Sequence, residues 1–237
     1  MKGKHRHPAL LACSTVVILM LVPVCLTAFA VYRQQRQERL DHALIAAVKA
    51  NDANAAIALL KQGADPNAHD KVHPAAPFWQ RIVAVIRGSK SKPSTAPTPL
   101  MLAVMWKDRP LPNGNLAFPP ENVALTGALL EHGADVNFHD ERQITPLFFA
   151  IMGEKEATMH LFLAHGANVN QRDSTGSTAL FTAVMVENAA VVKQLLAHHA
   201  DVTIRGWRGS TPLALAKEFP QDNQEIIHLL KAAGAKQ

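Results

Sequence analysis

Apolar residues follow two different patterns along the chain. Residues 8–32 contain no formally charged side chain and are rich in Leu, Val, Ala and Ile. From residue 41 onward, short apolar stretches alternate with polar turns. Leu147–Met152 and Met159–Ala164, for example, are separated by a turn at Glu154–Glu156. The first pattern predicts one long apolar helix, and the second predicts pairs of short helices joined by turns.

Two short motifs recur in residues 41–237. The first, Thr-Pro-Leu or Thr-Ala-Leu, begins at Thr98, Thr145, Thr178 and Thr211, and the second, Gly-Ala-Asp or a variant of it, begins at Gly63, Gly133, Gly166, His199 and Gly234. From Thr145 to Thr211, and from Gly133 to His199, the motifs recur every 33 residues. Thr before Pro is typical of a helix N-cap, and Gly is typical of a helix end in the left-handed conformation. One helix pair cannot bury its apolar face alone, so neighbouring pairs must stack.

This arrangement resembles the ankyrin repeat family, in which T-P-L-H-x-A-A opens one helix and G-A-D-V-N follows the second. The resemblance covers roughly 170 of the 237 residues and is closest in Thr145–Asn170. It implies an all-α, ankyrin-type solenoid of about five helix-turn-helix repeats over residues 41–237. The repeats are expected at approximately 41–70, 98–140, 144–173, 177–206 and 210–237.

Two insertions interrupt this pattern, at approximately residues 71–97 and 108–120. Long insertions in a compact fold are usually functional or disordered. The first insertion carries a basic segment, residues 78–92, whose apolar residues have helical spacing. This segment either covers the side of the first two repeats or lies on a lipid surface. In the second case the residues in contact with lipid would be Phe78, Trp79, Arg81 and Arg87.

Residues 1–40 are expected to form a basic tail, a transmembrane helix and a juxtamembrane segment. A helix over residues 8–32 would reach about 37 Å, and a hydrocarbon core is about 30 Å thick. We therefore expect a single-pass membrane anchor, although residues 28–30 also resemble a signal-peptide site cleaved after Ala30. Three basic residues flank the segment on each side, so the positive-inside rule gives a tie. A short basic tail usually stays in the cytoplasm, which favours repeats on the periplasmic or lumenal side.

The net charge of +5 is concentrated outside the repeats. Residues 1–40 and residues 71–97 each carry +5, so the remaining residues sum to −5. A nucleic-acid-binding surface needs Lys and Arg clustered on the folded face. We therefore expect no nucleic-acid partner.

Metal and catalytic chemistry are not expected either. Cys13 and Cys25 both lie in the apolar N-terminal stretch, which excludes a disulfide framework and a Cys-based zinc site. Equivalent histidines in stacked repeats lie about 10 Å apart, too far to share an ion held at about 2 Å. The sequence also lacks the common nucleophile, phosphate-loop, zinc-protease and dinucleotide motifs. The chain is therefore predicted to be no enzyme and to need no cofactor, metal or small-molecule substrate.

The family resemblance implies that a protein partner is recognised at the loop tips and at the exposed ends of the first helices. The expected contacts at the helix ends are Met105, Trp106, Met152 and Met185, and those at the tips are Glu141, Arg142, Trp207 and Arg208. One turn earlier, Met101, Phe148 and Phe181 are expected to pack between repeats. The predicted function is a membrane-tethered scaffold for protein binding. A dedicated inhibitor or immunity protein against an envelope-acting toxin, and a lipid-surface protein, are the alternatives.

Overall fold

The computed structural model describes residues 8–69, 96–105, 118–218 and 223–236. The chain divides into two compact units. The described part of one unit is residues 8–39, and the other unit contains the remaining described residues, from Leu40 onward. Every regular element in the described residues is a helix, which confirms the all-α prediction.

The first helix, α1, extends from Pro8 to Lys49, and its residues after position 39 belong to the second unit. Within the described part of the chain, no helix combines the length and the apolar character that crossing a membrane requires. The side chains of residues 8–25 lie outside the described residues. The transmembrane helix therefore stays a prediction.

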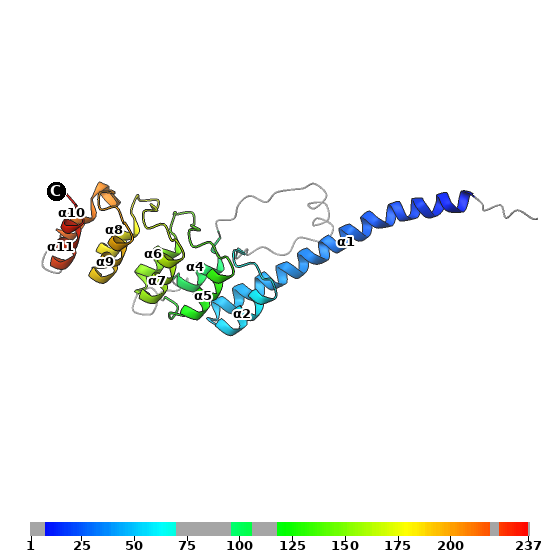
Figure 1. The fold of residues 1–237 in the computed structure, drawn as a ribbon, viewed down its shortest axis with the longest axis horizontal. Coiled ribbons are helices and arrows are strands. Elements are labelled where there is room, and N and C mark those ends of the chain that lie inside the picture. The colour runs from blue at the N-terminus through cyan, green and yellow to red at the C-terminus, as the bar shows by residue number, and fades with distance from the viewer. Residues whose placement is uncertain (1–7, 70–95, 106–117, 219–222, 237) are drawn as a thin grey trace, which may run out of the picture. The chain divides into compact units, whose positions relative to one another are not determined.

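In the second unit the helices form successive pairs that stack in two rows (Figure 1). The first helices of the pairs are the end of α1, α4 (Pro99–Val104), α6 (Pro146–Met152), α8 (Ala179–Met185) and α10 (Pro212–Ala216). The second helices are α2 (Ala53–Lys61), α5 (Val123–Glu131), α7 (Glu156–Ala164), α9 (Ala189–Ala197) and α11 (Gln224–Ala232). In the first row α4 contacts α6, α6 contacts α8, and α8 contacts α10. A short 3-10 turn, η1 (Trp207–Gly209), precedes α10.

Local capping explains where these helices begin and end. The hydroxyl oxygens of Thr98, Thr178 and Thr211 accept from the backbone N–H of the third residue of their helices, whereas Thr145 makes no such bond. Glycines with positive φ follow the second helices, as the sequence predicts. At the fourth of these positions His199 adopts a φ of 63°, a left-handed conformation that costs a non-glycine residue about 1 kcal/mol.

A ladder of asparagine side chains connects consecutive repeats. Each of these asparagines donates to the carbonyl of the helix-ending residue in the next repeat and accepts from an N–H two residues later. Asn137, for example, donates to Gly166 O at 3.2 Å and accepts from Asn168 N at 2.7 Å. Asn67 and Asn170 make the equivalent pairs of bonds. Because Asn67 bonds to Gly133 and Asp135, the first two repeats stay in register although an insertion separates them.

The α4 helix precedes the second insertion, and its C-terminal carbonyls are bonded differently from those of the regular repeats. After α6, the backbone N–H of Lys155 donates to Ala150 O at 2.9 Å, and the same type of bond follows α1 and α8. In α4 the equivalent carbonyls accept from a side chain of the next repeat instead. The Nζ of Lys155 lies 3.2 Å from Ala103 O and 3.3 Å from Val104 O. This cation also faces the negative end of the α4 dipole.

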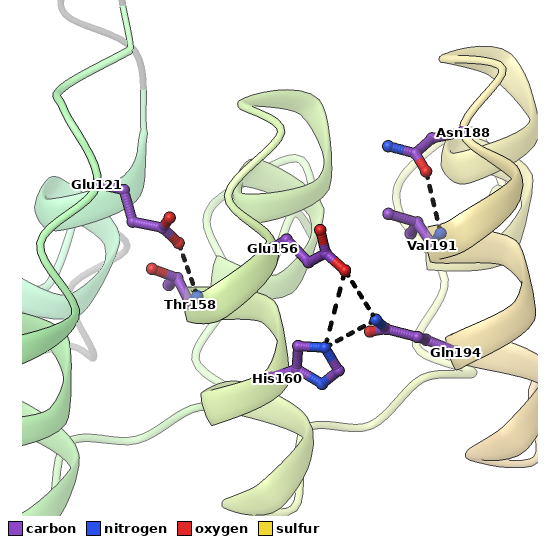
Figure 2. A network of polar contacts seen from close by, with 7 residues as sticks. All are labelled: Glu121, Glu156, Thr158, His160, Asn188, Val191 and Gln194. Carbon is purple, nitrogen blue, oxygen red and sulfur yellow. Dashed lines mark hydrogen bonds and ion pairs between the residues drawn. The ribbon is translucent and has the colours of Figure 1, made fainter.

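The start of α7 is capped from the preceding repeat. The residues before α2, α5 and α9 are Asp or Asn, and each accepts from the third N–H of its own helix. Figure 2 shows this bond between Asn188 and Val191. Before α7 the residue is Lys155, which has no acceptor, and the third N–H, that of Thr158, donates to Glu121 Oε1 at 2.7 Å (Figure 2). Lys155 and Glu121 thus satisfy backbone groups in each other's repeats.

Candidate functional site

The three methionines at the ends of the first helices differ in exposure. Met185 is 54% exposed, whereas Met105 is half-buried at the end of α4. Met152 is also half-buried. Next to it, a Cβ added to Gly153 would lie 2.9 Å from Phe118 Cδ1, so the Phe118 ring packs against the end of α6. Of these three methionines, Met185 in the fourth repeat is therefore the most accessible.

The aromatic and methionine side chains one turn earlier are buried. Met101, Phe148 and Phe181 each expose 3% or less of their surface. Their burial confirms that these side chains pack inside the repeat stack. Phe181 also lies under the next loop, because a Cβ on Gly206 would be only 2.8 Å from its ring. Met185, four residues after Phe181, lies on the same side of α8, one helical turn farther along the helix.

The loop tips are formed by residues 138–144, 171–177 and 204–210, which occupy equivalent positions 33 residues apart. Hydrogen bonds connect them, since Ser174 N donates to the backbone Arg142 O at 2.8 Å and Trp207 N donates to the side-chain Ser177 Oγ at 3.0 Å. Glu141 and Arg142 are exposed at the first tip. The predicted tip residues are therefore held in one continuous row.

The last tip presents a tryptophan and an arginine together. Trp207 is 51% exposed, and Arg208 Cζ lies 4.0 Å from the centroid of its ring, a cation–π arrangement. Arg208 has a φ of 56°, and the next residue, Gly209, has a φ of 70°. These two residues thus place a left-handed turn directly after Trp207.

The structure adds two residues at the tips that sequence reasoning missed. Arg172 donates from Nη2 to Arg205 O at 2.9 Å and from Nε to Gly176 O at 3.1 Å. Arg205 donates from Nη1 to Gly209 O at 2.9 Å. The 33-residue separation of these arginines, at the same position of consecutive loops, was the signal that would have identified them.

Several predicted site residues lie outside the described residues: Trp106 from the helix ends, and Phe78, Trp79, Arg81 and Arg87 from the first insertion. The contacts predicted for them, with a partner or with lipid, stay predictions.

The second helices carry a separate polar cluster, formed by Glu156, His160 and Gln194 (Figure 2). Gln194 Nε2 lies 3.2 Å from Glu156 Oε1 and 2.7 Å from His160 Nε2. The Glu156 and His160 side chains are more than half exposed and 4.0 Å apart. This cluster connects α7 to α9. No group of three potential metal ligands occurs in the described part of the chain, this cluster included.

Comparison with known proteins agrees with this architecture. A family model for a single ankyrin repeat matches residues 40–71, and a model for three ankyrin repeats matches residues 120–206 and 155–237. Together these matches span more than half of the chain. The chain belongs to the ankyrin repeat family. A search of curated proteins found no match. The ankyrin stack also includes α4, which lies between the matched segments and packs on α5 and α6.

Proposed function

We propose that this ankyrin repeat protein is a scaffold that binds a protein partner through the loop tips and first-helix ends of its last repeats. One observation carries the proposal. Among the described residues of the repeats, the exposed large apolar side chains are Val123, Met185 and Trp207. Two of these three lie on the face that the family resemblance assigns to partner binding. Exposed apolar groups with a polar rim are typical of interaction sites, and Trp is enriched among the residues that dominate binding energy.

The connection between these two side chains supports a single surface. Trp207 follows Gly206, whose backbone packs on Phe181, and Met185 is one helical turn from Phe181. A partner that covers the Trp207 tip would therefore meet Met185 next along α8. Because Phe181 is buried, the position of this loop is determined by packing rather than by the partner.

Single substitutions test this surface in the full-length chain. We expect Met185→Glu and Trp207→Ala each to reduce recovery of a cross-linked partner by about ten-fold or more, the usual effect of losing an interface hot spot. Val123→Glu is the matched control, because Val123 is 42% exposed but lies on a second helix, α5. Quantitative affinity capture followed by mass spectrometry measures the recovery. Equal recovery of the same partners by all variants would refute the proposed surface.

We also propose that the N-terminal part of α1 anchors the chain in a membrane. The support is the absence of formal charge from residues 8–32, all of which lie in α1. Replacing Leu19 and Val22 by Arg places two charges in the segment, at a cost of about 3 kcal/mol each near the bilayer centre. We expect this double variant to move from the carbonate-washed membrane fraction to the supernatant. Retention in the membrane would contradict the proposal, and a mature N-terminus at Val31 would indicate cleavage instead.

A further inference from the structure

The arginines of the last two loop tips are held in place by hydrogen bonds that leave their charge uncompensated. Arg172 and Arg205 donate to the carbonyls of Gly176, Arg205 and Gly209, which are neutral acceptors. These bonds fix the direction of both side chains. A guanidinium has five N–H donors, so most of the donors on each arginine stay available for another acceptor.

The acidic residues nearest to these arginines in sequence, Asp173 and Asp201, are each engaged within their own turn. Asp201 Oδ1 accepts from Thr203 N at 2.8 Å and from Thr203 Oγ1 at 2.6 Å. Asp173 Oδ1 accepts from Thr175 N at 2.8 Å, from Thr175 Oγ1 at 2.7 Å and from Ser177 N at 2.9 Å. In the described residues neither Arg172 nor Arg205 forms an ion pair, and the same holds for Arg208. At the last tip Gly206 occupies the position that Asp173 has in the preceding loop, so this tip carries two arginines and no acid.

The last two tips carry a net positive charge, whereas the repeats as a whole are acidic. Residues 171–177 and 204–210 together carry three arginines and one aspartate, whereas residues 41–70 and 98–237 sum to −5. A long polyanion that tracks along the repeats would meet this negative charge. A short acidic segment would bind the two tips without crossing it.

We infer that Arg172, Arg205, Trp207 and Arg208, which we call the arginine tip, bind a short acidic segment of the protein partner. Carboxylates of the partner accept from the free donors of Arg172, Arg205 and Arg208, and an apolar side chain next to them packs on Trp207. The stacked Trp207 and Arg208 are already ordered, which reduces the entropy lost on binding. This inference rests on the proposed function and specifies the chemistry of the partner.

The test measures fluorescence anisotropy of a labelled short peptide that alternates Glu and Phe, with the full-length chain in detergent micelles. We expect the peptide to bind, and the same peptide with Lys in place of Glu not to bind. Arg205→Gln and Arg208→Gln should each weaken binding by about ten-fold, the effect of one lost charge-assisted bond. Arg208 makes no hydrogen bond through its side chain in the described residues, so its replacement leaves the fold intact and keeps the test decisive.

The matched control is Lys193→Gln, which removes the same charge from an exposed position on α9. If Lys193→Gln weakens peptide binding as much as Arg208→Gln does, the attraction is non-specific and the inference fails. It also fails if the Glu peptide does not bind, or if oligothymidine or vesicles containing phosphatidylserine bind more tightly. A captured partner whose recovery depends on Met185 but not on Arg205 or Arg208 would refute the acidic segment and leave the proposed function standing.

Discussion

Replacing Lys155 with Met should lower the free energy of unfolding by about 1–3 kcal/mol at pH 10, the cost of leaving buried carbonyls without a donor. Met preserves most of the apolar stem of the lysine, so the change isolates the loss of Nζ. This atom supplies hydrogen bonds to Ala103 O and Val104 O at the end of α4. Lys155 is only 4% exposed, and water therefore cannot easily replace the hydrogen bonds that its Nζ donates.

The cost of this substitution should depend on pH. Burial lowers the pKa of Lys155 from 10.5 to about 8, while Glu121 acts in the opposite direction. Between about pH 8 and pH 10.5, Lys155 of the unfolded chain still binds a proton that Lys155 of the folded chain has released. The free energy of unfolding of the wild-type protein therefore gains a contribution as pH rises from about 8 to 10.5, and this contribution is lost as pH falls again. Met does not titrate, so the Lys155→Met variant lacks this pH-dependent contribution.

Denaturant unfolding of both proteins at pH 7 and pH 10 measures this difference. Lys193→Met is the control, since Lys193 is exposed on α9 and its side chain makes no hydrogen bond in the described residues. A cost for Lys155→Met that is the same at both pH values, or one that Lys193→Met reproduces, would contradict the assigned role of the buried amine.

Replacing Gly206 with Ala should destabilise the last repeat by about 1–3 kcal/mol, the usual cost of overpacking. The added Cβ would lie 2.8 Å from Phe181 Cδ2 and 2.8 Å from Ser177 Oγ. Phe181 is buried and cannot move aside, and the Ser177 hydroxyl accepts from Trp207 N. The loop must therefore shift, and it carries the arginine tip with it.

Hydrogen exchange should localise this effect to residues 207–236, with little change in α2 and α5, because stacked repeats interact only with their neighbours. Gly127→Ala is a control of opposite sign. Gly127 lies inside α5, where an added Cβ would meet Leu161 Cδ2 at an ordinary 3.7 Å. Ala is favoured over Gly in a helix by about 1 kcal/mol, so this variant should be more stable than the wild type. Uniform loss of protection throughout the stack in Gly206→Ala would argue against a local clash.

Part of the candidate site could be predicted from sequence because helix ends depend on residues close to them in the chain. The motifs beginning at Thr145 and Gly166 located the ends of α6 and α7, and the repeat distance then placed Met185 and Trp207 on the expected face. Exposure could not be read in the same way. Met152 and Met185 occupy equivalent positions, but their exposure differs, and Phe118 from another segment packs against Gly153, the residue after Met152.

The sequence by itself determined the family, the helical class and the packing role of Phe148 and Phe181, since all three follow from a 33-residue period and local capping. Only the tertiary structure showed that Lys155 and Glu121 satisfy backbone groups of each other's repeats. It alone showed that Arg172 reaches across to Arg205 O. The physical reason is distance along the chain. A cap is completed within about four residues, whereas these bonds join residues more than 30 positions apart and exist only because stacking brings neighbouring repeats into contact.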